Sequence, residues 1–212
     1  MRSDDPEYRD RRCCYPSTVT MMEVTDRSAV RGEPERYGKP AILLHWVTAA
    51  LIVANWLLGL SMVPMPISPR KLSWYLVHKS IGLTVLLLSS LRLGWRAVRP
   101  PPPPVAMPRW QRRAASASHA LLYALLFAIP LSGWLYSSAT GVQVVYLGIV
   151  PLPNLVAKDR ALADVLRLVH ISLNGLLFVV FCVHVAAAIK HHVVDRDTAL
   201  VRMLPFMKPV RP

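Results

Sequence analysis

The sequence is short of cysteine and of acidic residues, and each shortage excludes a class of protein. Of its three cysteines, Cys13 and Cys14 are adjacent and Cys182 lies in an apolar block, so no disulfide framework is expected. Asp and Glu number 12 against 25 Lys and Arg, which gives a formal net charge of +13. These cations lie between apolar blocks and not along one basic helix or stripe. A nucleic-acid partner is therefore not expected, and orientation in a membrane explains the charge better.

Long hydrophobic blocks dominate what is present. Hydrophobic residues make up 53% of the 212 positions and charged residues only 17%, which is typical of a membrane protein. Four stretches approach the length of about 20 apolar residues that a helix needs to cross a bilayer. They are residues 41–63, 74–95, 114–136 and 165–189. We predict an all-α integral membrane protein, a bundle of four transmembrane helices embedded in the lipid bilayer.

The connections between these blocks predict the orientation. Five arginines and no acid separate the second block from the third, and further cations follow the fourth block. The two other connections carry fewer cations. Cytoplasmic segments are enriched in Lys and Arg, so both termini are expected in the cytoplasm. The predicted location is the inner (cytoplasmic) membrane of a bacterium.

The rest of the chain divides around the bundle. Residues 1–36 are polar and are predicted to be a disordered cytoplasmic leader; translation could also start within it, at Met21 or Met22. Residues 37–205 form the predicted four-helix domain, and 206–212 a basic cytoplasmic tail. The prolines at 100–104 predict a stiff, non-helical spacer. Residues 141–153 are apolar but too short to span, and are expected to lie on the outer surface.

Histidines inside the predicted spans carry the chemistry. Five of the seven lie in or at the edge of a span, where ionisable side chains are rare and usually functional. They are His45, His78, His119, His170 and His184. His170 and His184 are fourteen residues apart on one helix, which returns to within about 40° of the same face and separates them by about 21 Å. One helix therefore offers a ligand near each membrane surface.

The predicted topology arranges the histidines in two pairs. His45 and His184 lie near the inner surface, and His78 and His170 near the outer surface. Two imidazoles on opposite sides of a porphyrin fill both axial positions of its iron, so two haems are predicted. The chain lacks a C-x-x-C-H motif, so coordination alone would hold them. His119 lies at the level of His45, and geometry alone leaves open which of them faces His184. His119 could instead donate a proton to a quinone.

Basic residues near the outer histidines suggest a second role for this level. Lys79 and Arg167, with Arg70 and Lys71, could steer an anion toward the outer haem. They could equally bind haem propionates or lipid headgroups. Catalytic roles are therefore predicted for His119, Lys79 and Arg167, in the vicinity of the quinone and the anionic substrate.

These motifs resemble the bacterial four-helix cytochrome b561 family, which is related to the cytochrome b subunits of hydrogenases and formate dehydrogenases. The resemblance covers about residues 36–205. It rests on Leu44-His45-Trp46, on Val77-His78-Lys79-Ser80-Ile81-Gly82, and on Ser118-His119-Ala120-Leu121-Leu122-Tyr123. It also rests on His170, on His184-Val185-Ala186-Ala187-Ala188, and on the tail from His191-His192 to Pro205.

The resemblance implies two b-type haems, bound by His45, His78, His170 and His184, and electron exchange with membrane quinone. It favours His45 over His119 as the inner ligand. Members of the family are similar to superoxide oxidases, so the expected function is transfer of electrons from periplasmic superoxide, or from a redox protein, to ubiquinone. No obligate protein partner is expected. One alternative is a cytochrome b subunit that links a hydrogenase or dehydrogenase to the quinone pool. A metal-binding transporter or scaffold is a remote alternative.

Overall fold

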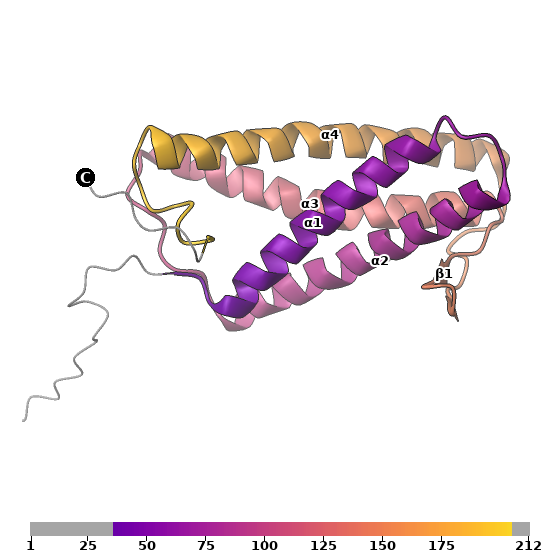
Figure 1. Ribbon diagram of the computed structural model, residues 1–212, viewed down its shortest axis with the longest axis horizontal. Coiled ribbons are helices and arrows are strands. Elements are labelled where there is room, and N and C mark those ends of the chain that lie inside the picture. Colours follow the sequence, from indigo (N-terminus) through magenta and orange to yellow (C-terminus); the bar gives the residue numbers. More distant parts are fainter. Residues whose placement is uncertain (1–35, 205–212) are drawn as a thin grey trace, which may run out of the picture. The chain divides into compact units, whose positions relative to one another are not determined.

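The computed structural model describes residues 36–204 (Figure 1). The predicted leader and the basic tail 206–212 lie outside these residues, except for Arg36. Four helices and one short hairpin make up the fold. They are α1 (Lys39–Met62), α2 (Pro69–Val98), α3 (Arg109–Ala139), β1 (Val145–Tyr146), β2 (Val150–Pro151) and α4 (Arg160–Val193).

All four helices are long and apolar enough to cross a membrane, which confirms the predicted spans. α2, α3 and α4 extend beyond their apolar blocks at both ends, whereas α1 begins two residues before its block and ends one residue short of it. α2 begins five residues before the predicted span and α4 continues four residues past it. The extra turns are more polar, because they project toward the headgroups and water beyond the hydrocarbon core.

Local signals fix where two of the helices begin. Ser68 precedes α2 and its hydroxyl accepts a hydrogen bond from the Lys71 amide at 3.3 Å. Asp159 precedes α4 and its carboxylate accepts from the Leu162 amide at 3.1 Å. Both side chains satisfy amides that have no partner within the helix. Pro69 then occupies the first position of α2, where its missing N–H costs nothing.

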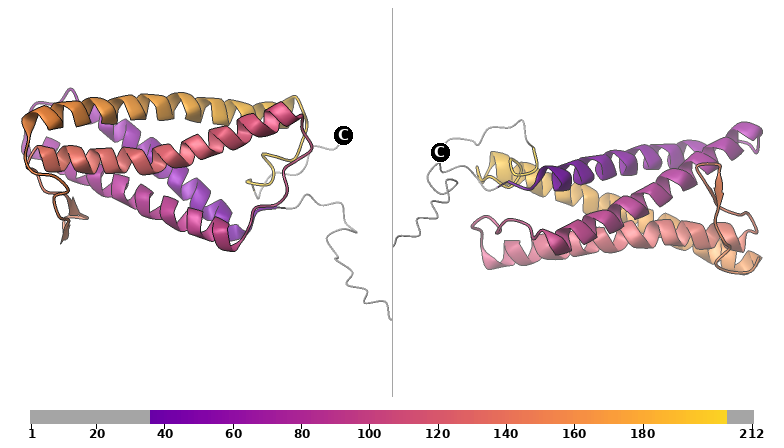
Figure 2. Two further views of the ribbon diagram at one scale, coloured as in Figure 1. Left: turned by 180° about the vertical axis from the view of Figure 1, so that it is seen from behind. Right: turned by 90° about the horizontal axis from the view of Figure 1, so that it is seen from below.

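The helices pack in chain order. α1 lies against α2, α2 against α3, and α3 against α4. Seen from behind, α3 and α4 run side by side, and the hairpin lies at the end of the bundle opposite the end of α4 (Figure 2). We call the end where α1 begins and α4 finishes the terminal end, and the opposite end, which carries β1 and β2, the hairpin end.

Small polar side chains are prominent among the buried residues of the helices, while many large apolar ones face outward. The buried polar residues are all Ser or Thr: Thr48, Ser80, Ser89, Ser132, Ser137 and Ser138. Leu and Val residues along every helix are exposed; Leu60, for example, is 69% exposed. In lipid, large apolar side chains gain nothing by facing inward, and small residues let helix backbones approach closely. The packing is thus that of a membrane bundle.

A hairpin occupies the connection between α3 and α4. The sequence predicted only an apolar surface loop there, and the two strands are an addition to the predicted all-α fold. Val145 pairs with Pro151 and Tyr146 with Val150 in antiparallel register. Residues 147–149 join the two strands. Leu147 and Gly148 turn the chain with φ of 54° and 73°, the positive values that tight hairpin turns use. The Leu147 amide donates to Ser80 Oγ at 3.0 Å, which fastens the hairpin to α2.

Two connections meet at the terminal end. The proline run 100–104 contains no helix, as predicted. The Arg202 guanidinium donates to the Pro103 carbonyl oxygen, and Trp46 Nε1 donates to the Met203 carbonyl oxygen at 2.8 Å. Val201, which directly precedes Arg202, is fully buried. The segment after α4 therefore folds back onto the start of α1 and onto the proline spacer.

Candidate haem sites

Each helix carries two site positions fourteen residues apart, so the bundle has two levels. The terminal level comprises His45, Arg92, His119 and His184, and the hairpin level comprises Gly59, His78, Gly133 and His170. Contacts between helices join members of the same level. His45 and His119 both lie near His184, while His78 lies near His170 and against Gly59. The fourteen-residue spacing, which places two side chains near the same helix face about 21 Å apart, therefore occurs once on each of the four helices.

At the hairpin level, His78 and His170 face each other across the bundle. Their ring centroids are 6.3 Å apart and the ring planes are inclined by 79°. Glycines on the neighbouring helices make room for both rings. A Cβ added to Gly59 would lie 3.3 Å from His78 Cε1, and one added to Gly133 would lie 3.1 Å from His170 Cε1. Any larger residue would push a ring out of place.

Hydrogen bonds on α3 orient the His170 ring. His170 Nδ1 lies 3.2 Å from the Ile129 carbonyl oxygen and 2.9 Å from Ser132 Oγ. The Ser132 hydroxyl itself donates to the Ile129 carbonyl at 2.8 Å. A carbonyl beside Nδ1 favours the tautomer protonated there, which leaves Nε2 as the metal-binding nitrogen. This arrangement is typical of a histidine that ligates a metal.

At the terminal level, His184 has two histidine neighbours. The centroids of His45 and His184 are 6.4 Å apart, nearly the same separation as in the hairpin-level pair, and those of His119 and His184 are 5.4 Å apart. The third histidine predicted at this level therefore does lie beside the other two. The likeness of the 6.3 and 6.4 Å separations favours His45 as the partner of His184.

The spacing of the helices fits a flat cofactor between each pair. No Cα atom of α4 lies within 8 Å of a Cα atom of α1 or α2, although histidines from these helices face one another. An imidazole nitrogen stands about 2 Å from a transition-metal ion, so two rings on opposite sides of one ion have centroids about 6 Å apart. The hydrogen bonds of the His170 ring use Nδ1, which leaves its Nε2 available to a metal ion. The residues present therefore fit two bis-histidine haems.

Aromatic side chains fill the bundle between the two levels. Trp56 on α1 lies between His45 and Gly59 in the sequence, and Phe178 on α4 lies between His170 and His184. Their rings are in contact, with centroids 4.6 Å apart and planes inclined by 56°. This pair is therefore an apolar side-chain contact between α1 and α4, whose backbones do not approach each other closely.

The cations predicted to act at the outer level occupy different environments. Lys79 follows His78 directly, is half-buried, and donates from Nζ to Ser137 Oγ at 2.6 Å. Arg167 is exposed one turn before His170. Lys71 Nζ is turned toward the loop before α2, where it donates to the Met65 carbonyl. Lys79 and Arg167 therefore remain the two cations next to the hairpin-level pair in sequence.

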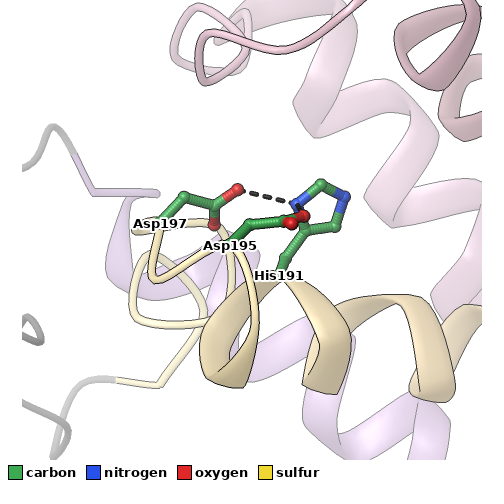
Figure 3. Close-up of side chains that lie close together, drawn as sticks. All are labelled: His191, Asp195 and Asp197. Atoms are coloured by element: carbon green, nitrogen blue, oxygen red, sulfur yellow. Dashed lines mark hydrogen bonds and ion pairs between the residues drawn. The ribbon is translucent and has the colours of Figure 1, made fainter.

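A separate cluster of ionisable groups lies beyond the end of α4 (Figure 3). His191 Nδ1 is 2.7 Å from an Asp197 carboxylate oxygen and 3.1 Å from an Asp195 oxygen. Lys190 also pairs with Asp195 at 2.7 Å, and the second Asp197 oxygen accepts from the Ala199 amide. These bonds turn the chain back at the terminal end. The cluster holds the segment that follows α4 in place, and its charged atoms already form ion pairs and hydrogen bonds with one another.

Comparison with known proteins agrees with this geometry. The sequence profile of a family described as prokaryotic cytochrome b561 matches residues 36–206. Cytochrome b561 homolog 2 of Escherichia coli K12 is 37% identical over 176 residues, 81% of this chain and 92% of the relative. Homolog 1 of the same strain is 29% identical, over 82% and 99%. A probable superoxide oxidase CybB of Yersinia pestis is 28% identical, over 81% and 97%.

Proposed function

Because the chain belongs to the prokaryotic cytochrome b561 family, which implies b-type haem and electron transfer in a membrane, we propose that it is a di-haem superoxide oxidase that reduces ubiquinone. The observation that supports two haems is the pair of alike histidine arrangements, with ring centroids 6.3 and 6.4 Å apart. The similarity to a probable superoxide oxidase supports the choice of donor.

His45 and His184 would hold one haem, and His78 and His170 the other. The haems would supply one-electron redox chemistry, and two histidine ligands at each site would favour electron transfer over oxygen binding. The bundle keeps the two sites on one side of α4, about 21 Å apart along the helix. The Trp56 and Phe178 rings lie between the two levels in sequence and contact each other. The resulting path runs from one membrane surface to the other.

The hairpin end is the proposed donor side and faces the periplasm. The five arginines from Arg96 to Arg113, at the end of α2 and the start of α3, lie at the terminal end. Cytoplasmic segments are enriched in such cations, which supports a cytoplasmic location for this end. Superoxide is an anion, so Lys79 and Arg167 beside the hairpin-level histidines would raise its local concentration. Each superoxide gives up one electron and leaves as dioxygen.

The terminal end is the proposed acceptor side. Ubiquinone takes two electrons and two protons to become ubiquinol, so two superoxide anions are oxidised for each quinone reduced. His119 lies 5.4 Å from His184, between ring centroids, and is the terminal-level histidine left over once His45 and His184 are paired. We assign it the delivery of protons to the quinone, a role that suits imidazole near neutral pH.

The test is to purify the chain in mild detergent, count haem by the pyridine haemochrome method, and follow ubiquinone reduction by a superoxide-generating system. We expect two b haems per chain and superoxide-dependent formation of ubiquinol. His119→Ala should retain both haems but slow ubiquinol formation. Protein without haem would refute the cytochrome assignment, and colourless protein with stoichiometric zinc would establish the metal-binding transporter or scaffold instead.

A subunit of a hydrogenase or dehydrogenase would behave differently in the same assay. It would hold two haems but reduce quinone only with electrons from a partner subunit. Haem-loaded protein that is inactive with superoxide would therefore refute the proposed donor while leaving the haem sites intact.

A further inference from the structure

Arg92 is a cation inside a membrane span, and it belongs to the terminal level. It follows His78 by fourteen residues on α2, so it lies near the same helix face about 21 Å away. At the hairpin level, the two positions next to the paired histidines are glycines, Gly59 and Gly133. At the terminal level, the positions next to the paired histidines are Arg92 on α2 and His119 on α3.

The surroundings of Arg92 place it beside the terminal-level histidines. Its guanidinium stacks over the Tyr123 ring on α3, with Cζ 5.5 Å from the centroid. Tyr123 is one turn from His119 and therefore on the same face of α3. Arg92 is also close enough to His45, His119 and His184 to interact electrostatically with each of them. Its stacking on Tyr123 directs Arg92 toward α3.

No acidic residue in the part of the chain that the structure describes neutralises Arg92. Only four carboxylates lie between residues 36 and 204. Asp159 and Asp164 are at the hairpin end, and Asp195 and Asp197 bind Lys190 and His191. A half-buried guanidinium without a counter-ion is costly in a low-dielectric bundle. The site is therefore built for an anion that the protein does not supply.

We propose that Arg92 binds the propionate carboxylates of the haem held by His45 and His184. This inference rests on the proposed function, because it requires a haem at the terminal level. A guanidinium matches a carboxylate in shape and can bind both of its oxygens at once. Stacking on Tyr123 holds the guanidinium in one orientation. Arg92 thereby fixes which edge of the macrocycle points to α2. Its positive charge also makes that haem easier to reduce than the haem at the hairpin level.

The experiment compares the wild type with Arg92→Gln, Arg92→Lys and, as a control, Arg99→Gln at the end of α2. Two quantities are measured on each haem-loaded protein: the midpoint potentials, by spectroelectrochemistry, and the rate of haem transfer to an apoprotein acceptor. Charged hydrogen bonds contribute about 1.5–3 kcal/mol, so Arg92→Gln should release one haem about tenfold to hundredfold faster. The potential of that haem should fall, and Arg92→Lys should give intermediate values.

Repeating the measurement in the His170→Ala background, which retains only the His45 and His184 pair, assigns the affected haem. Unchanged potentials and transfer rates in Arg92→Gln would overturn the inference while leaving the two haems in place. A change that appears only in bilayers with anionic lipid, and not in detergent, would assign Arg92 to a lipid phosphate and would also overturn it. Wild-type protein without haem would instead overturn the proposed function.

Discussion

Replacing Gly133 by Ala should weaken the hairpin-level site and leave the terminal-level site intact. The added Cβ would lie 3.1 Å from Cε1 and 3.3 Å from Nδ1 of His170. Both separations are shorter than ordinary van der Waals contact. The ring would have to move by a few tenths of an ångström, away from the Ile129 carbonyl and Ser132 hydroxyl that orient it. The change therefore acts on the geometry of a ligand without removing it.

The magnitude follows from the size of this overlap. Overpacking a filled site by one methyl group costs about 1–3 kcal/mol. Ala is favoured over Gly within a helix by about 1 kcal/mol, but this gain is the same with and without haem and cancels from haem affinity. The hairpin-level haem should therefore bind about fivefold to hundredfold more weakly, since about 1.4 kcal/mol is a factor of ten.

The assay is a haem titration of detergent-solubilised apoprotein, with the two haems distinguished by their electron paramagnetic resonance signals. Gly94→Ala is the matched control, because it is also in a helix and its Cβ would meet nothing within 4 Å. Gly59→Ala, at 3.3 Å from His78 Cε1, should give a smaller loss at the same haem. If Gly133→Ala titrates like Gly94→Ala, the glycines do not shape the site and the two-level description is wrong.

Four further substitutions test other parts of the bundle. His170→Ala and His184→Ala should each lose one haem while the helices still insert, and haem counts of two in either variant would refute the pairing. Lys79→Gln should slow superoxide-driven ubiquinone reduction several-fold at low ionic strength. The difference from the wild type should vanish at high salt, because screening removes the attraction between the lysine and superoxide. An equal loss of rate at all salt concentrations would indicate a structural role for Lys79. Trp46→Phe removes the hydrogen bond to the Met203 carbonyl, and the loss should cost about 1 kcal/mol. Proteolysis of the segment after α4 should therefore be faster than in the wild type. An unchanged cleavage rate would show that this bond does not hold the segment.

The sequence predicted the features that depend on residue type and periodicity. Four spans follow from apolar length, and the levels of His170 and His184 follow from helix geometry alone. The non-helical proline spacer follows from the missing amides and fixed φ of proline. The place of His119 beside His184 is likewise consistent with the predicted level. These are properties of single helices, and they survive assembly unchanged.

Features that depend on how helices meet could not be predicted in the same way. Gly59 and Gly133 resemble any other small residue in a span until the rings of His78 and His170 are placed against them. Arg92 resembles an interfacial arginine until its stacking on α3 is known. Each of them follows a histidine of the same helix by fourteen residues: Gly59 follows His45, Gly133 follows His119 and Arg92 follows His78. This spacing could have identified them, once the same spacing of His170 and His184 had been interpreted as two levels. The hairpin depends on the backbone at Leu147, where a non-glycine residue adopts positive φ against its usual preference.

Both proposed haem sites take one ligand from α4 and the other from an earlier helix. Since α4 leaves the ribosome after α1, α2 and α3, neither pair can form until α4 has been synthesised. Cofactor loading must then follow membrane insertion of the whole bundle, and the empty protein has to persist long enough to receive both haems. Chains truncated before residue 160 lack α4 and therefore one ligand of each proposed haem site. Such fragments could enter the membrane but could not bind either haem between two histidines, so they could not transfer electrons.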